Sequence, residues 1–251
     1  MSFEDKYNES ALYANMNQLA SLMATKEKLM RISAPQIECD YMFHYGALEY
    51  KVGGLTYKAD LLQRQIEIKC ENQSLSREKV ESLAKKEFQK RTKERVLMGQ
   101  RVVNAVKRLE EPMPSPKEIQ ECEKLIESLI LKLHPFFTRK TSKYNTSLLN
   151  KAFQYFEKGN VKALSVMDYI TPKAPPVDKD DHVKHNMFIT VKIKQTVAAL
   201  NLLQDGYPFN KVALIADRKK LPQMQSELSE KLKKEQNRIY SLEKTLNSLF
   251  Q

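Results

Sequence analysis

The chain has 251 residues, 41% of them hydrophobic, and a formal net charge of +11 at neutral pH. This length and composition allow one or two domains with real hydrophobic cores, which excludes a largely disordered chain. Only six glycines, ten prolines and no tryptophan occur. Leu, Lys, Glu, Gln and Met, which enter helices at little entropic cost, are abundant. The composition therefore predicts an all-α fold.

The cysteines and the hydropathy exclude several classes of protein. The three cysteines lie far apart and lack C-x-x-C spacing, which argues against both a disulfide framework and a zinc site. No stretch approaches the ~20 apolar residues that cross a bilayer, and the N-terminus lacks a basic segment followed by an apolar one. The sequence therefore predicts a cytoplasmic protein with no membrane span, no metal and no other cofactor.

The positive charge makes nucleic acid, anionic lipid and acidic protein surfaces candidate partners, because long-range attraction and counterion release need no sequence specificity. Within residues 79–95, however, lysines and arginines alternate with glutamates, which is typical of a solvated helix face. The sequence contains no RNP motif, zinc finger or evident recognition helix. Nucleic-acid binding by this basic region is therefore an alternative and not the first hypothesis.

The first predicted region, residues 1–110, consists of long coiled-coil helices. A first seam has steps of four and three, at Leu12, Met16, Leu19, Met23 and Met30, with Lys26 as its one polar interruption. Ser33-Ala34-Pro35 is predicted to break this helix, because proline removes a backbone donor. A second seam runs from Tyr41 to Ile66, and the glycines inside it indicate either the close approach of another helix or a weak point in the rod. A third helix is predicted to begin at Ser76 and continue to about Leu109.

The second predicted region, residues 117–170, lies between two proline-rich linkers at 110–116 and 171–176. It contains an apolar-striped helix that ends near Leu133 and a second helix that stops at Gly159-Asn160.

The third predicted region, residues 177–251, is an antiparallel coiled-coil hairpin. Its first helix runs to about Gln204, a turn follows at 205–210, and its last helix has four-three spacing from Leu221 to Leu249.

The middle region carries the most specific motif in the chain. Leu133-His134-Pro135 ends its first helix, and Phe156-Glu157-Lys158-Gly159 ends its second. This pattern resembles the central hairpin of a J domain. The whole layout is similar to a group of bacterial coiled-coil proteins with an embedded J-like (DnaJ-like) hairpin. In that group, a segment like 45–50 precedes the motif and a turn like 207–210 follows it. The resemblance implies a small helical hairpin flanked by long coiled-coil helices.

In J domains, a His-Pro-Asp loop stimulates a DnaK-type chaperone ATPase, and its carboxylate makes a charge-assisted contact with the chaperone. His134 and Pro135 match that loop, but Phe136 stands where the aspartate belongs. An aromatic ring cannot replace an ionic acceptor, so the resemblance implies a retained scaffold without co-chaperone activity. A purely local reading is also open: the proline ends the helix and the histidine caps it.

The candidate partner-binding residues cluster at this corner. If the two phenylalanines are exposed, they offer an apolar protein contact; they could equally pack on the following helix. A lysine at the end of the preceding helix would supply the basic contact. The complete set is Lys132, His134, Pro135, Phe136 and Phe137.

No P-loop, nucleophile elbow, H-E-x-x-H motif or carboxylate cluster occurs, so the sequence predicts a protein that is not an enzyme. The first hypothesis is a protein-interaction or scaffold protein that binds a protein partner through helix-in-groove contacts. The alternatives are a J-type co-chaperone of a DnaK-type ATPase that tolerates Phe136, and a basic coiled-coil nucleic-acid-binding protein. The seams could close within one chain or between chains, which leaves a homo-oligomer open.

Overall fold

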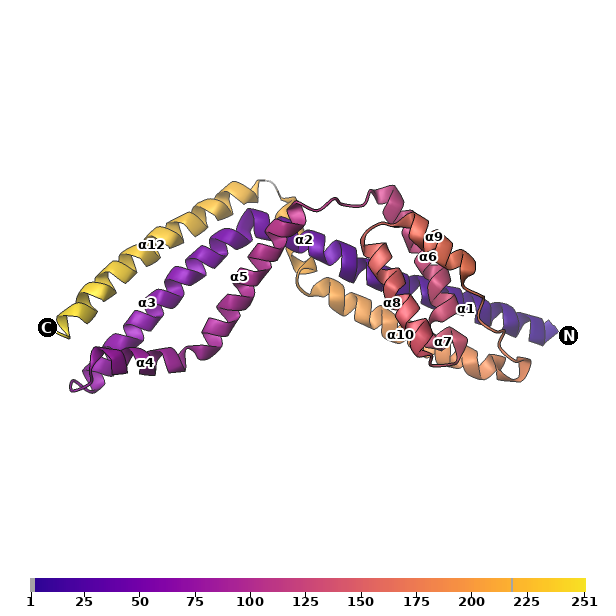
Figure 1. The fold of residues 1–251 in the computed structure, drawn as a ribbon, viewed down its shortest axis with the longest axis horizontal. Helices are drawn as coiled ribbons and strands as arrows, with labels where there is room; N and C mark the ends of the chain where they lie inside the picture. The colour runs from indigo at the N-terminus through magenta and orange to yellow at the C-terminus, as the bar shows by residue number, and fades with distance from the viewer. Residues whose placement is uncertain (1–2, 218) are drawn as a thin grey trace. The chain divides into compact units, whose positions relative to one another are not determined.

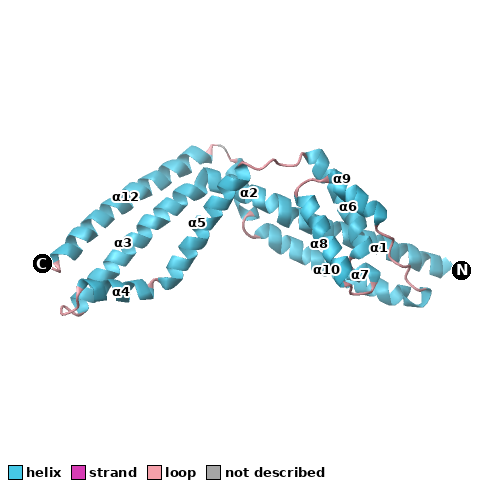
Figure 2. Cartoon of the chain, in the orientation of Figure 1, coloured by secondary structure: helices cyan, strands magenta, loops and turns pink. Residues whose placement is uncertain are grey.

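A computed structural model describes residues 3–217 and 219–251, with side chains from Glu9 onward. The structure is 85% helical, and the described residues contain no β-strand, which confirms the predicted all-α fold (Figures 1 and 2). None of the helices in these ranges combines the length and the apolar composition that crossing a bilayer requires. Met1, the start of the first predicted region, lies outside the described residues.

The helices form two compact units, and each unit combines segments that are distant in sequence. Unit 1 joins Met1–Gln36 to Pro112–Asn210, and unit 2 joins Ile37–Glu111 to Lys211–Gln251. Their boundaries cut across the predicted regions, because helices near the N-terminus pack against helices from later parts of the chain.

Unit 1 is built around α6 (Pro116–Leu133), which contacts α1 (Phe3–Lys28), α8 (Lys143–Glu157) and α9 (Val161–Ile170). Helix α1 also packs along α10 (His182–Asp205). Figure 1 shows these helices gathered around α6 and α1. The largest side chains that the unit buries completely are Leu12, Leu19, Ile126, Leu129, Ile130, Phe137, Phe156, Leu164 and Ile189.

Local sequence explains where α6 begins. The Ser115 hydroxyl accepts the Glu118 N–H at 3.2 Å, and the Glu118 carboxylate accepts the Ser115 N–H at 2.7 Å, which together form a capping box. Pro116 occupies the first helical position, where its missing donor costs nothing. Three short segments complete the helices around this unit: α7 (Pro135–Thr138) and the 3₁₀ turns Lys179–Asp181 and Phe209–Lys211.

Unit 2 is built around α3 (Ala47–Glu71), which contacts α12 (Lys220–Ser248), α4 (Arg77–Glu87) and α5 (Gln89–Leu109). In Figure 1, α12 lies along one side of α3, and α4 and α5 lie along the other. The short helix α11 (Val212–Ala216) precedes α12. A small apolar cluster joins α3 to α4, with Ile68, Val80 and Ala84 buried and Leu61, Leu75, Leu83 and Phe250 packed around them.

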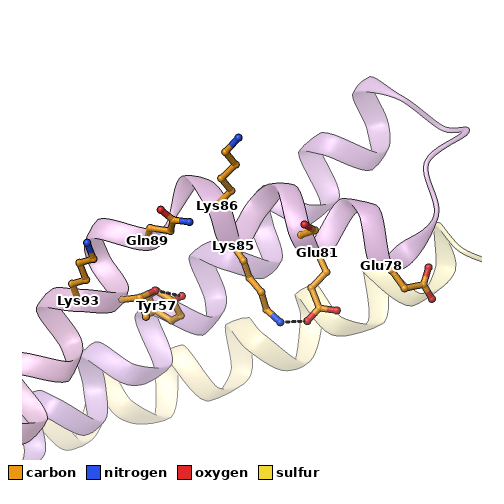
Figure 3. A pocket seen from close by; sticks show the side chains of 9 residues that line it. Tyr57, Glu78, Glu81, Lys85, Lys86, Gln89 and Lys93 are labelled. Atoms are coloured by element: carbon orange, nitrogen blue, oxygen red, sulfur yellow. Dashed lines mark hydrogen bonds and ion pairs between the residues drawn. The ribbon is translucent and has the colours of Figure 1, made fainter.

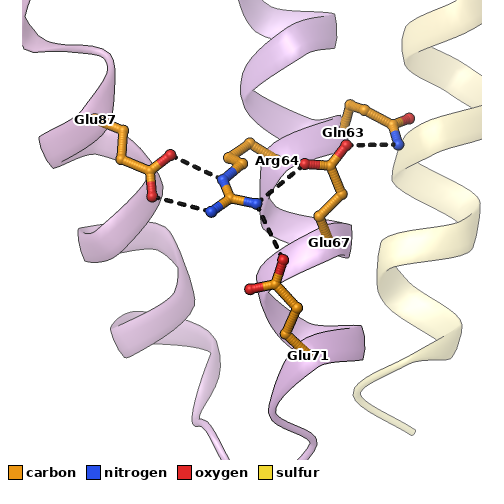
Figure 4. A network of polar contacts seen from close by, with 5 residues as sticks. All are labelled: Gln63, Arg64, Glu67, Glu71 and Glu87. Atoms are coloured by element: carbon orange, nitrogen blue, oxygen red, sulfur yellow. Dashed lines mark hydrogen bonds and ion pairs between the residues drawn. The ribbon is translucent and has the colours of Figure 1, made fainter.

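An arginine of α3 also ties α3 to α4 (Figure 4). The guanidinium of Arg64 donates two hydrogen bonds to the Glu87 carboxylate, at 2.8 and 3.2 Å, and one each to Glu67 and Glu71. The hydrogen bonds from Arg64 lower the pKa of Glu87. Because this cluster is exposed, solvent screens it, and we assign it a role in fixing the register of the two helices more than in stability.

The backbone stays helical where the sequence predicted a break at Ser33-Ala34-Pro35, so that prediction is wrong. A π-helical turn at Leu29–Ser33 precedes α2 (Ala34–Tyr41), and the Ala34 N–H donates to the Leu29 carbonyl. This wider turn shifts the hydrogen-bond register, so that a proline without a donor fits into the helix. A second π-helical turn, Met42–Gly46, leads into α3.

The third helix begins as predicted but is not continuous. The Ser76 hydroxyl accepts the Lys79 N–H and caps α4. The chain then leaves helical geometry at Phe88, where φ is −90° and ψ is 6°, and this residue separates α4 from α5.

Each of the two C-terminal helices packs on an N-terminal helix of its own unit, a contact that the sequence did not predict. Helix α10 packs against α1 in unit 1, and α12 packs against α3 in unit 2. Two residues of the seam predicted in the last helix, Ile239 and Leu246 of α12, are buried, as are Ile189 and Leu200 of α10. The spacing of apolar residues in one helix does not specify which other helix will cover them, so the contacts with α1 and α3 could not be predicted.

Gly159 stops α8 as the sequence predicted. Its φ of +63° lies in the left-handed region, and the Asn160 N–H donates back to the Tyr155 carbonyl. A Cβ at Gly159 would lie 2.5 Å from the Cβ of Pro114. Both the backbone conformation and the neighbouring proline therefore require glycine here.

Gly159→Ala should destabilise unit 1 by about 1–2 kcal/mol from the left-handed backbone alone, and by more because Pro114 must move. Gly53→Ala is a suitable control, because the nearest atom to its new Cβ would be the Arg95 Nη1, 3.9 Å away. The control should gain about 0.5–1 kcal/mol of helix stability. Urea unfolding followed by circular dichroism measures both changes, and a Gly159→Ala chain as stable as the wild type would contradict this account.

Candidate functional site

The candidate site is the His-Pro-Phe corner between α6 and α8. Helix α6 ends where the His134 N–H donates to the Ile130 carbonyl, with His134 itself in extended conformation. The His134 Nδ1 then accepts the Phe136 N–H at 3.2 Å, which caps the one-turn helix α7. The histidine does act as a helix cap, as the local interpretation predicted. Its side chain, however, caps the start of α7 and not the end of α6.

The two phenylalanines of the corner have different environments. Phe137 is completely buried in the core of unit 1, so it offers no exposed surface to a partner. Phe136 is partly buried, with its ring centroid 4.6 Å from that of His134 and 5.7 Å from that of Phe188 in α10. The ammonium of Lys192 lies over the same ring, 5.1 Å from its centroid. The corner therefore packs against α10, a contact that the sequence did not predict.

Lys132 is bound within the chain. Its Nζ donates to the Asp168 carboxylate and to the Asp168 carbonyl, each at 2.7 Å, and its side chain is 14% exposed. The ion pair fastens the end of α6 to α9. A lysine held in this way is not a free basic contact for an incoming partner, which corrects its assignment as a docking residue.

A pocket of about 310 Å³ opens beside the corner between α1, α6 and α10. Its lining includes His134, Phe136, Lys192 and Thr196. The Thr196 hydroxyl donates to the Lys192 carbonyl at 2.8 Å and so is not paired with the histidine. Among the described lining residues, no nucleophile is therefore held by a general base.

Burial lowers the pKa of His134, which favours the neutral imidazole. The same physical cause lowers the pKa of His185, whose ring stacks on Phe188. A neutral His134 agrees with the hydrogen bond at the corner, because an imidazolium could not accept the Phe136 N–H at Nδ1.

The cysteines and the possible metal ligands are not arranged for nucleophilic catalysis or metal binding. Burial raises the pKa of the Cys122 thiol to about 11 and also raises that of Cys39, so both stay protonated. Across the described residues, His, Cys, Asp and Glu side chains form no group of three that could hold a metal ion.

A larger pocket in unit 2, about 850 Å³, contains neither histidine nor cysteine in its described lining. Figure 3 shows that its Lys85 is turned towards Glu81, with which it forms an ion pair. Charged groups of both signs line this pocket, so it does not offer a small ligand a cavity of one charge.

Sequence reasoning found the residues of the corner but missed what they contact. Phe188 and Lys192 lie on α10, and Asp168 lies on α9, all more than thirty positions away along the chain. The spacing of Phe188 and Lys192 on one helix face is the only local signal for the contact, and that spacing does not indicate which ring it would cover.

Acidification should destabilise unit 1 partly through His134. Because its pKa in the folded chain is lower than in the unfolded chain, the unfolded chain takes up the proton first, so stability is full above pH ~6.5 and falls as the pH drops below it. His134→Asn keeps a capping acceptor that does not titrate.

The Asn variant should lose less stability than the wild type between pH 7.5 and pH 5, as measured by thermal unfolding. His185→Asn should remove a separate part of the same dependence. An unchanged pH dependence in the His134→Asn chain would count against this role.

Phe137→Ala should destabilise unit 1 by about 3–5 kcal/mol, because it leaves a cavity in a packed core. Phe136→Ala is the matched control at the neighbouring position. It removes the ring contacts with His134 and Phe188 and the Lys192 contact from a partly buried site, so its loss should be smaller than that of Phe137→Ala. Chemical denaturation of the two variants compares these losses, and equal losses would show that the two rings are equivalent.

Comparisons with known proteins add no family to this description. No family model matches the chain, no curated protein matches it, and no solved structure matches it. The likeness of residues 117–170 to a J domain therefore rests on the His-Pro motif and the helices on either side of it, and it stays a prediction.

Proposed function

We propose that this chain is a non-enzymatic protein-interaction or scaffold protein built on a degenerate J-like domain. The observation that carries the proposal is the packing of Phe136 against Phe188, with ring centroids 5.7 Å apart. The position that would carry the chaperone-binding aspartate of a J domain instead holds an aromatic ring that contacts α10 of the same chain. The corner thus stabilises the scaffold, and binding is left to the exposed helix faces.

Three features of the corner weigh against a J-type co-chaperone. The ionic acceptor of the His-Pro-Asp loop is missing, because Phe136 occupies its position. Lys132, the basic residue at the end of α6, is paired with Asp168. Phe137 is buried and cannot contribute an apolar contact in its place.

Three of the seven cations of residues 79–95 are engaged within unit 2, which weighs against nucleic-acid binding by that region. Lys85 pairs with Glu81, and the guanidinium of Arg91 donates to the Asp60 carboxylate at 2.9 Å. The guanidinium of Arg95 lies over the Tyr50 ring, 5.1 Å from its centroid. These groups are satisfied within unit 2 and have less to gain from phosphate contacts.

A steady-state ATPase assay with a DnaK-type chaperone separates the first two hypotheses. We expect no stimulation by the wild-type chain. We also expect none by Phe136→Asp, which restores the tripeptide but leaves Lys132 paired with Asp168. Stimulation by the wild type that His134→Gln removes would establish the co-chaperone function and overturn the proposal.

Affinity capture of the intact chain from its native cells tests the positive claim. A protein partner should be retained after nuclease treatment and identified by mass spectrometry. Loss of all captured material on nuclease treatment, together with a steep salt dependence of direct nucleic-acid binding, would favour the nucleic-acid alternative. A chain that retains no protein at all contradicts the proposal.

A further inference from the structure

Helix α5 has an unusual charge for its length. Seven of its side chains are cationic and one, Glu94, is a carboxylate, so its net charge is +6 out of +11 for the whole chain. Among the described helices with ten residues or more, the most negative net charge is −1. The cationic side chains of α5 are Lys90, Arg91, Lys93, Arg95, Arg101, Lys107 and Arg108.

One face of α5 is occupied by the rest of unit 2. The guanidinium of Arg95 lies between Tyr50 and Tyr57, 5.1 and 5.4 Å from their ring centroids. Gly54 of α3 permits this approach, because a Cβ there would lie 3.0 Å from the Arg95 Nη2. Further along, the Cys39 thiol donates to the Ala105 carbonyl at 3.3 Å, and Ala105 is buried. The inner face of α5 therefore has its partners within the unit.

The opposite face of α5 is uncovered and partly apolar. Positions 93, 96, 100, 103 and 107 follow in alternating steps of three and four, so they form one stripe along the helix. The stripe has a lysine at each end, and all five of its residues are exposed. Its apolar members and the apolar residues beside it are Val96, Leu97, Val103 and Val106, which are 66%, 64%, 47% and 53% exposed.

We propose that this stripe, which we call the α5 outer face, binds an amphipathic helix of a partner protein, and that this helix has acidic residues beside its apolar seam. The inference rests on the proposed function and names its class of partner. The three-four spacing matches the seam of a helix pair, and β-branched valines are well suited to such a seam. Lys93 and Lys107 are placed to meet carboxylates on either side of the partner's apolar residues.

The chemistry of the stripe favours this occupant over others. No aromatic residue lies among its apolar members, whereas single-stranded nucleic acid is bound by aromatic stacking. Interfacial membrane helices use Trp, Phe and Leu, whereas this face has one leucine, Leu97, among valines, which bury less apolar area. A second copy of α5 would bring one helix of charge +6 against another, which like-charge repulsion opposes.

A designed peptide tests the inference on the intact chain. The probe is a three-heptad helix with isoleucine and leucine at its seam and glutamate beside the seam, labelled for fluorescence anisotropy. A second probe has the same seam but lysine in place of glutamate. We expect the acidic probe to bind more tightly than the basic one and to weaken with added salt.

Two sets of variants separate the seam from the charge. Val96→Ser with Val103→Ser should weaken binding of the acidic probe at least tenfold. Lys93→Glu with Lys107→Glu should weaken it similarly and strengthen binding of the basic probe. Val183→Ser with Val191→Ser, a matched pair of exposed valines on α10, should leave binding unchanged. Circular dichroism checks that each variant retains the wild-type helix content.

Equal binding of the two probes, no binding of the acidic probe, or insensitivity to the Val96 and Val103 changes would each overturn the inference. Tighter binding to phosphatidylserine vesicles or to a single-stranded oligonucleotide, if lost in the same valine variant, would overturn it in favour of that ligand. If the probe fails but affinity capture still retains a protein, the proposed function stands and only the assignment of the α5 outer face is wrong.

Discussion

In unit 1 the helices are assembled on the apolar surfaces of α1 and α6, and in unit 2 on that of α3. Helix α1 packs against α6 and α10, and α3 packs against α12, α4 and α5. Isolated helices of these lengths are marginal in water, and burial of apolar surface contributes about 25 cal/mol per Å². The contacts with α1 and α3 therefore hold the fold together, and the His-Pro-Phe corner and the free face of α5 take their positions from them.

The corner illustrates how one residue changes the role of a loop. An aspartate after His-Pro would have remained in solvent, because burying its charge without a partner is costly. A phenylalanine gains from burial, and Phe136 lies against Phe188 with Lys192 over its ring. Phe136 is therefore an inner contact of unit 1. His134 still organises the turn, but as the neutral cap of α7.

Helix α5, in contrast to the corner, has an outer face whose charged and apolar side chains remain exposed. On its inner face, Arg91 and Arg95 lie over aromatic rings, and Arg91 also bonds Asp60. Its outer face keeps valines and lysines in regular spacing with nothing from unit 2 over them. Positive charge and exposed apolar area occur together on this helix, and this combination suits a partner helix that is both apolar and acidic.

The sequence by itself determined the all-α fold, the helix start at Ser76 and the stop at Gly159, because these depend on backbone hydrogen bonds and steric limits within a few residues. It also located the His-Pro-Phe corner. Only the tertiary structure decided that α10 covers α1, that Phe137 is core and that Lys132 belongs to Asp168. Apolar burial has no direction, so a sequence can give a helix its apolar face without specifying which helix will cover it.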